Sequence, residues 1–178
     1  GIFFKDIECL RAIQPKYFML ENVIPSSDED LKTMTECIGV EPILIDSGRF
    51  SSQNRERYYW TNIPLGKLPD ESPLVLKDIM EKSVDEKYFY KKDFEILDMS
   101  KRVCAELKVN SMEMNRRIYN PDFKCCTLTC INGGYHEKKV LDSGRPRKLT
   151  EVEYERLQGL PDNFTKIQLN NRWLSYSK

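Results

Sequence analysis

A carboxylate at the end of a short apolar run is the first candidate for chemistry in this sequence. Glu21 closes the run at residues 16–22, which is bounded by polar residues and is typical of a strand buried on both faces. Ligands of open α/β sheets bind beyond the carboxyl ends of the strands, where Glu21 would project. There it could serve as a general acid. The structural alternative is a carboxylate that caps a neighbouring loop.

Two arginines are the second candidates. Gln53, Arg55 and Arg57 alternate at every second position, which predicts that they share one side of an extended segment. Neighbouring guanidinium groups need anionic or carbonyl partners once they are partly buried. One could hold a carboxylate such as Glu21, and the other a base oxygen or a phosphate. The alternative is a pair of surface arginines on an edge strand.

A loop rich in hydroxyl and glycine residues is the third candidate. Thr127 and Thr129 lie shortly before Gly133 and Gly134 in a basic part of the chain. Such a loop can approach a nucleic-acid backbone closely and donate hydrogen bonds to phosphates. A plain hairpin that turns at the two glycines explains the same residues.

The charge distribution is uneven although the formal net charge is zero. Residues 115–148 contain eight basic and three acidic residues, whereas residues 1–114 contain 16 basic and 21 acidic ones. A basic block beside an acidic body is compatible with a phosphate-contacting face. Ordinary charge scatter in a solvated loop region is the alternative.

Length and composition limit the class of protein. The 178 residues, 40% hydrophobic and 31% charged, suit one domain or one compact lobe with a small appendage. No apolar run approaches the roughly 20 residues of a membrane span. The cysteines occur without a secretory leader, in a pattern typical of an intracellular α/β protein with reduced thiols. The chain starts at Gly1 rather than Met, which indicates a processed, cloned or partial chain.

Three of the cysteines are close enough in sequence to suggest a metal site. Cys125, Cys126 and Cys130 lack the paired Cys-x-x-Cys or His partners of structural zinc sites, and His136 is the only histidine. We therefore predict no metal site and interpret these cysteines as small buried or half-buried strand residues.

The spacing of apolar residues and the residue types at helix ends predict the elements that position Glu21 and the arginines. Apolar residues at helical spacing predict a helix at 2–13, and Ser27 and Gly39 are typical N-cap and C′ residues of a second helix. Strand, helix and strand at this spacing predict a βαβ unit with a parallel pair, followed by a further strand. The strands are expected at 16–22, 42–46 and 56–61.

The character of the sequence changes after Asn62, and residues 64–146 predict a small irregular inserted lobe. Within it we expect helices at 74–80 and 93–108 and β structure at 116–141.

The C-terminal segment opens a last helix. Thr150 and Glu153 form a capping box, because each side chain can bond the backbone N–H of the other. The helix is predicted to run through Leu157. Residues 170–178 show no clear period.

The order and spacing of these strings resemble those of the C-terminal half of the DNA cytosine-5 methyltransferases. The resemblance implies an α/β fold, namely a partial Rossmann-like methyltransferase sheet with an inserted small α+β target-recognition lobe. Three strings carry it: Glu21-Asn22-Val23, Gln53-Asn54-Arg55-Glu56-Arg57, and Arg147 through Phe164. It divides the chain into a catalytic part (1–63), a target-recognition region (64–146), a supporting return helix and loop (147–169) and a tail (170–178).

The same resemblance implies roles for individual residues. Glu21 would engage a cytosine flipped out of double-stranded DNA, and Asn22 would fix the local geometry. Arg57 would contact the cytosine carbonyl oxygen and Arg55 would order the loop of the nucleophile, with Gln53 in support. DNA contacts are expected at six positions: Thr127, Thr129, Gly133, Gly134, Arg147 and Arg156. Such a protein would act inside the cell, in the cytoplasm and nucleoid or in the nucleus, without a membrane.

Two parts of that machinery have no counterpart here. No cysteine follows a proline, and no glycine-rich loop follows a first strand. We therefore expect a missing N-terminal half or partner subunit to carry the Pro-Cys nucleophile and most of the S-adenosyl-L-methionine site, and the chain alone to be inactive. The alternatives are an inactive DNA-binding or regulatory remnant of such an enzyme, or an unrelated α/β domain.

Overall fold

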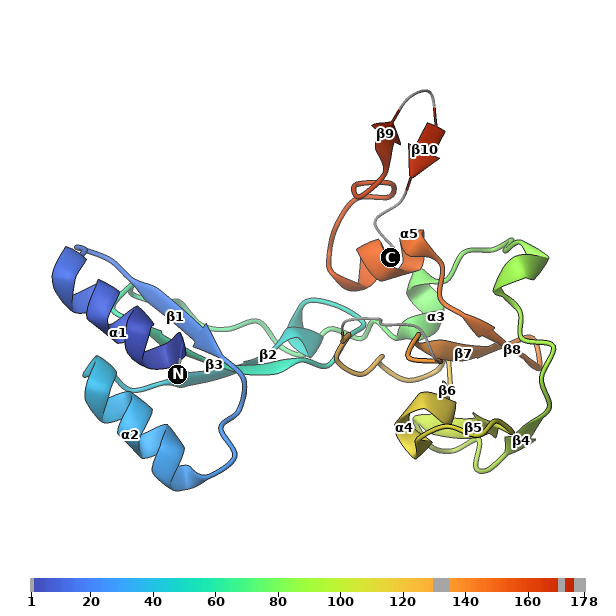
Figure 1. Cartoon of the computed structure of the whole chain (residues 1–178), viewed down its shortest axis with the longest axis horizontal. Helices are drawn as coiled ribbons and strands as arrows, with labels where there is room; N and C mark the ends of the chain where they lie inside the picture. The colour runs from blue at the N-terminus through green and yellow to red at the C-terminus, as the bar shows by residue number, and fades with distance from the viewer. Residues whose placement is uncertain (1, 130–134, 170–171, 175–178) are drawn as a thin grey trace. The chain divides into compact units, whose positions relative to one another are not determined.

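The chain divides into two compact units (Figure 1). The computed structural model describes residues 2–129, 135–169 and 172–174. Unit 1 comprises Gly1–Ser47 and Arg55–Asp70, and unit 2 comprises Gly48–Asn54 and Glu71–Lys178. The sequence-based division at 63/64 therefore differs from the boundary between compact units, which falls at 70/71. In addition, Gly48–Asn54 belongs with unit 2.

Unit 1 is a three-stranded sheet with two helices, in the strand order β1-β3-β2. Since β3 is antiparallel to both neighbours, β1 and β2 run in the same direction but do not pair. The sequence predicted that β1 and β2 pair directly as parallel strands, and this is wrong. The chain folds back after β2 and places β3 between them. The elements are α1 (Ile2–Ile13), β1 (Met19–Asn22), α2 (Asp28–Ile38), β2 (Ile43–Asp46) and β3 (Glu56–Thr61).

Burial alternates along β1, whereas the sequence predicted a strand buried on both faces. Met19 is 63% exposed, while Leu20 is half-buried opposite Trp60 of β3. The Trp60 indole N–H donates to Thr35 Oγ1 of α2 at 3.1 Å, so α2 covers the face that carries Leu20 and Trp60. Met19 and Glu21 point to the opposite face, because successive side chains of a strand alternate.

Both predicted ends of α2 are confirmed. Ser27 Oγ accepts a hydrogen bond from the Asp30 backbone N–H at 3.1 Å. Gly39 adopts a left-handed φ of 83° and donates its N–H to Thr35 O at 2.8 Å. A glycine meets this conformation without the steric cost that a Cβ would bring.

Unit 2 contains a five-stranded sheet in the order β4-β5-β6-β7-β8, antiparallel except for the parallel pair β6–β7. Two of its helices are single turns, and a separate hairpin, β9–β10, follows the last helix. The elements are α3 (Leu76–Ile79), β4 (Phe94–Ile96), β5 (Val103–Leu107), α4 (Glu113–Arg116), β6 (Arg117–Tyr119), β7 (Lys139–Asp142), β8 (Arg145–Lys148), α5 (Glu151–Leu157), β9 (Ile167–Leu169) and β10 (Arg172–Leu174). Two short 3-10 turns complete the chain, at Ser47–Arg49 and Glu86–Tyr88.

The helix predicted at 93–108 is wrong. The segment forms β4 and β5, which pair antiparallel through a tight turn where Asp98 Oδ1 accepts from the Ser100 N–H at 2.9 Å. Apolar residues at helical spacing misled the prediction, because Cys104 and Leu107 are also buried when the segment is extended. Pairing with β6 then overrides local helix preference. The predicted β structure in 116–141 is confirmed at β6 and β7, and the turn at Gly133 and Gly134 lies outside the described residues.

Two apolar clusters form the core of unit 2. One joins α3, β7 and α5, and includes Leu76, Val140 and Leu157. The other lies around β5 and includes Leu107 and Ile118. Among the described helices, none has the length and apolar composition needed to cross a bilayer.

Candidate active site

The Glu21 carboxylate of unit 1 is held by both predicted arginines. Arg55 Nη2 donates to Glu21 Oε1 at 3.3 Å. Arg57 Nε lies 3.0 Å from the same oxygen, in ion-pair contact but without good hydrogen-bond geometry. Among the residues that the structure describes, both arginine contacts are with Oε1 of Glu21, and Oε2 has no hydrogen-bond or ion-pair partner. The carboxylate is thus anchored through one oxygen, and the other remains available to a ligand.

Backbone contacts explain how the arginines reach Glu21. Glu21 and Arg57 lie on adjacent strands, β1 and β3, and belong to the same face of the sheet. The Arg55 N–H donates to Asp46 Oδ1 at 2.7 Å, and the Ser47 N–H donates to Arg55 O at 3.1 Å. The end of β2 therefore fixes the residue that precedes β3. The Arg57 side chain is only 15% exposed, so little of its charge is screened by water.

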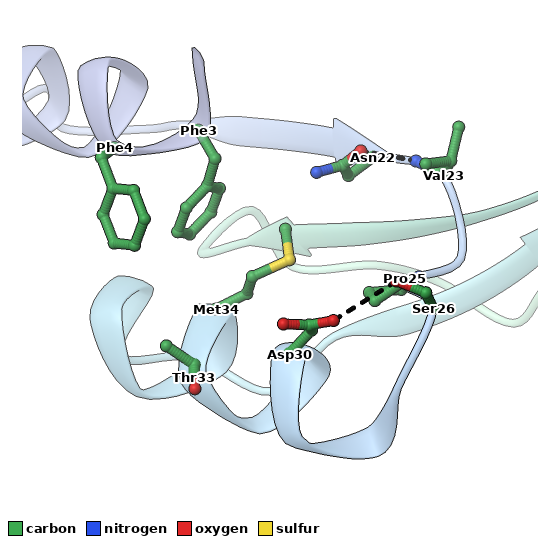
Figure 2. Close-up of a pocket in the computed structure, with 9 residues that line it drawn as sticks. All are labelled: Phe3, Phe4, Asn22, Val23, Pro25, Ser26, Asp30, Thr33 and Met34. Atoms are coloured by element: carbon green, nitrogen blue, oxygen red, sulfur yellow. Dashed lines mark hydrogen bonds between the residues drawn. The ribbon is translucent and has the colours of Figure 1, made fainter. Parts of the chain in front are cut away.

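Asn22 shapes the chain beyond β1. Its Oδ1 accepts a hydrogen bond from the Val23 N–H at 2.8 Å, a local contact of the kind that competes with regular strand pairing. Beside it lies a pocket of about 270 Å³, shown in Figure 2. Phe3 and Met34 contribute apolar walls, and Asp30 contributes a carboxylate.

The pocket beside Asn22 does not fit S-adenosyl-L-methionine, the methyl donor that the resemblance implies. The donor carries a sulfonium cation and an amino-acid group, which need several polar partners. The one carboxylate here, Asp30, already accepts hydrogen bonds from Ser27 Oγ at 2.8 Å and Ser26 Oγ at 3.4 Å, which close the first turn of α2. We therefore assign no donor contact to these residues. Within the described parts of the chain, no cluster of three or more His, Cys, Asp or Glu side chains is placed to bind a metal ion.

Gln53 lies in unit 2 rather than with the arginine pair in unit 1. It is buried, and its Nε2 donates to Cys126 O at 3.5 Å, while its Oε1 accepts from Gln158 Nε2 at 3.2 Å. The string from Gln53 to Arg57 thus crosses the boundary between the two units. The regular strand starts only at Glu56, so the predicted alternation over all three residues does not describe one continuous strand.

The predicted DNA-contacting loop is described only in part. Thr127 is half-buried, and its Oγ1 donates to Asn54 O at 3.1 Å. Thr129 is exposed. Gly133 and Gly134 lie outside the described residues. Of the two described threonines, Thr129 is therefore the one that is open to a ligand.

Arg147 was predicted to contact DNA, and the structure corrects this. Its side chain is fully buried. Nη1 and Nη2 each donate to Glu153 at 2.7 Å, and Nε donates to Asp142 Oδ2 at 2.6 Å. Glu153 also accepts from the backbone N–H groups of Thr150 and Glu81, each at 2.9 Å. The predicted capping box is thus confirmed, and Arg147 completes a buried network that joins β8 to α5.

The Arg156 guanidinium group makes most of its contacts within unit 2. It donates to both oxygens of Asp162, at 2.8 and 2.6 Å, and to Ile79 O at 2.9 Å. Its side chain remains 31% exposed. A DNA contact at Arg156 would have to share the guanidinium with these partners.

Lys124 has a positioning role that the sequence interpretation missed. Its ammonium group lies within hydrogen-bond distance of four backbone carbonyls: Gly48 at 3.0 Å, Ser51 at 3.2 Å, Ser72 at 2.6 Å and Leu74 at 2.9 Å. The sequence counted it with the basic block, because a lysine among polar residues usually indicates a solvated surface. Instead it fixes the segment that leads into Arg55.

A sequence profile identifies the family, and a curated relative is similar to most of the chain. The profile of the C-5 cytosine-specific DNA methylases matches residues 1–176. The Type II methyltransferase M1.ScrFI of Lactococcus lactis subsp. cremoris is 26% identical over 186 residues, which cover 92% of this chain and 47% of that protein.

Solved structures show the same fold. The Entamoeba histolytica methyltransferase EhMeth matches with a TM-score of 0.54 and 20% identity, over 85% of this chain and 52% of that one. The S. pombe Dnmt2 methyltransferase matches with a TM-score of 0.51 and 17% identity, over 89% and 59%. This confirms a Rossmann-like methyltransferase fold, and the chain spans about half the length of these relatives. Because the profile matches nearly the whole chain, the protein belongs to the C-5 cytosine-specific DNA methylase family.

Proposed function

We propose that this chain is part of a DNA cytosine-5 methyltransferase and that Glu21 engages the target cytosine. The supporting observation is the carboxylate itself, which two arginines hold through one oxygen while the other is available. A base inside a duplex cannot be reached by such a group, so the cytosine would be flipped out of the stack.

The proposed chemistry gives each side chain a distinct task. The Glu21 carboxyl group donates to the ring nitrogen N3 and accepts from the exocyclic amine. This withdraws electrons from the ring and makes C6 open to attack by a thiolate. Arg57 contacts the cytosine carbonyl oxygen, and Arg55 orders the loop that carries the nucleophile. Asn22 and Gln53 support this arrangement.

We infer that the nucleophile and the methyl donor belong to another part of the enzyme. An N-terminal half or partner subunit would carry a cysteine after a proline, and S-adenosyl-L-methionine would supply the methyl group. One feature of unit 1 fits such a complement: β1 is an edge strand that pairs only with β3 in the described sheet. An unpaired strand edge is a ready template for an added strand.

We further propose that unit 2 reads double-stranded DNA. Thr129 is exposed and follows Thr127 in the basic part of the chain. Gly133, Gly134 and Arg156 complete the proposed set, whereas Arg147 is excluded by its burial. Phosphate and groove contacts from such a loop would hold the duplex while the base is flipped. The protein would then act inside the cell, where the DNA is.

The role of Glu21 is tested with Glu21→Gln in the enzyme completed by its N-terminal half. Duplex binding should stay within about twofold, and methyl transfer should fall by at least about 100-fold, the scale of losing a positioned general acid. Glu41→Gln is the matched control, because Glu41 is an exposed carboxylate of the same unit. Unchanged turnover in Glu21→Gln would refute the assignment.

Arg57 is tested by separating turnover from affinity. Arg57→Ala should reduce turnover more than DNA affinity, because its proposed contact is with the base. Arg57→Lys keeps the charge but loses the planar fork, so it should recover affinity without full turnover. A loss of affinity alone would mean that Arg57 contacts a phosphate instead.

A further inference from the structure

The chain passes between the two units three times, and two consecutive residues of unit 2 bind the segments at these passages. The passages lie between residues 47 and 48, 54 and 55, and 70 and 71. In unit 2, Lys124 binds the segments that follow the first and the third passage, and Cys125 binds the segment that precedes the second. The proposed methyltransferase chemistry uses neither residue.

The half-buried Lys124 side chain joins two segments that are distant in the sequence. Two of its four carbonyl acceptors belong to residues 48–51, and the other two belong to residues 72–74. The Ser72 N–H also donates to Gly48 O at 3.3 Å, so the two segments are bonded to each other as well. An ammonium group has three hydrogens. These three donors already face four acceptors, so a DNA phosphate would have to displace one of them.

Cys125 binds the next part of the same segment through its backbone. The Cys125 N–H donates to Ser52 O at 2.8 Å, and the Asn54 N–H donates to Cys125 O at 2.9 Å. Gln53 lies between these two residues and forms a parallel β-bridge with Cys125. The segment 48–54 is therefore bonded to Lys124 in its first half and to Cys125 in its second half.

Arg55 follows this segment directly, and its own contacts lie in unit 1. Its N–H donates to Asp46 Oδ1 at 2.7 Å, and its carbonyl accepts from the Ser47 N–H at 3.1 Å. Its guanidinium group reaches Glu21 Oε1 at 3.3 Å. Because a single peptide bond joins Asn54 to Arg55, a shift of residues 48–54 moves the Arg55 backbone and disturbs its contact with Glu21.

We propose that Lys124 is a positioning residue for Arg55: it holds residues 48–54 so that the Arg55 guanidinium group meets the Glu21 carboxylate. The effect on turnover rests on the proposed function, because only methyl transfer makes the Glu21 contact catalytic. Lys124 thus serves the catalytic arginine and not a DNA phosphate, although it belongs to the basic block of the sequence. A misplacement of about 1 Å caused far from the reacting atoms can lower a rate about 100-fold.

The first test is hydrogen exchange at the Arg55 amide of the full chain, which needs no active enzyme. In Lys124→Met this amide should exchange at least about tenfold faster than in the wild type, because bonds from a charged donor are lost, while α5 stays protected. Lys77→Met is the control, since Lys77 pairs with the exposed Asp122, and it should leave the Arg55 amide unchanged. Unchanged exchange at Arg55 in Lys124→Met would overturn the proposal.

The second test separates positioning from a phosphate contact in the enzyme completed by its N-terminal half. Lys124→Met should lower turnover at saturating DNA by at least about tenfold. Duplex affinity should stay within about twofold with an unchanged salt dependence, whereas losing a phosphate contact reduces the slope of log K against log salt by about 1. Weaker binding with a smaller slope would overturn the proposal. If the completed wild type transfers no methyl group, the proposed function fails, and exchange at Arg55 still decides the role of Lys124.

Discussion

The two units differ in how completely they bury their apolar residues. In the described parts of the chain, unit 2 has twelve buried apolar residues, whereas unit 1 has two, Ile7 and Trp60. Helix α2 of unit 1 has no buried residue at all. Unit 2 also contains the buried network of Arg147 and Glu153.

The larger core and the proposed catalytic residues therefore lie in different units. The proposed catalytic residues Glu21, Arg55 and Arg57 belong to the unit with the smaller core. That unit also exposes several apolar side chains: Ile2 at 83%, Ile13 at 73%, Met19 at 63% and Val23 at 54%. A unit that exposes so much apolar surface is expected to be covered by further protein. We therefore expect unit 1 to depend on a complement more than unit 2 does.

The largest effect is expected where unit 2 depends on a buried charge pair. Arg147→Ala leaves the Glu153 carboxylate buried without its cation, which should destabilise unit 2 by about 3–5 kcal/mol. Urea unfolding followed by circular dichroism measures the change. Arg145→Ala is the control, because Arg145 lies two residues away with an exposed partner, Glu86. Similar midpoints for the two variants would contradict a core held by this network.

The next effect concerns the contacts of Lys124. Lys124→Met removes the ammonium group that lies within hydrogen-bond distance of four carbonyls, and should destabilise unit 2 by about 2–3 kcal/mol. Hydrogen exchange should speed up at residues 48–54, while α5 stays protected. Lys77→Met is the control, since the Lys77 partner, Asp122, is exposed. Unchanged exchange at 48–54 would show that the segment is fixed by other contacts.

A third prediction uses the edge strand of unit 1. Met19→Lys places a charge on β1 and should reduce self-association of the isolated chain, because charged edge strands resist strand pairing. Ile96→Lys makes the same change on β4, an edge strand of unit 2, and should have little effect. Sedimentation at several concentrations compares the two. Equal effects would mean that association does not depend on unit 1.

The smallest effect is expected at a helix end of unit 1. Ser27→Ala removes the side-chain acceptor of the Asp30 N–H and should cost about 1 kcal/mol locally. Hydrogen exchange at the first turn of α2 detects it. Ser26→Ala is the control, because its hydroxyl makes only the 3.4 Å contact with Asp30. Equal protection in both variants would contradict the role of Ser27 as the cap.

The local signals in the sequence were reliable where neighbouring residues alone determine the structure. The caps at Ser27 and Gly39 and the capping box of Thr150 and Glu153 each depend on contacts within a few residues. The helix at 2–13 has the same character, since its periodicity lies in the segment itself.

Contacts between distant segments explain what could not be predicted. The segment 93–108 is extended because β5 pairs with β6, and its apolar spacing fits a helix equally well. Arg147 is a different case: its partners Asp142 and Glu153 lie only five and six positions away, but a basic residue in a basic segment suggests a surface. Lys124 was also assigned to the basic surface, but its ammonium group contacts backbone carbonyls 50 and more positions away, such as those of Gly48 and Leu74. The contact of Arg55 and Arg57 with Glu21 joins residues 34 and more positions apart, and the sequence suggested it only as one option, because two neighbouring guanidinium groups need anionic partners.

The most direct test of the division between the two parts of the enzyme is methyl transfer from labelled donor to mixed-sequence duplex DNA. It is measured with this chain alone, with the N-terminal half alone, and with both together. We predict incorporation only when both are present. Incorporation by this chain alone would contradict our assignment of the nucleophile and donor to another part. If no methyl group is incorporated in any of the three reactions although the two parts bind each other, the result would contradict an active enzyme and indicate a DNA-binding remnant.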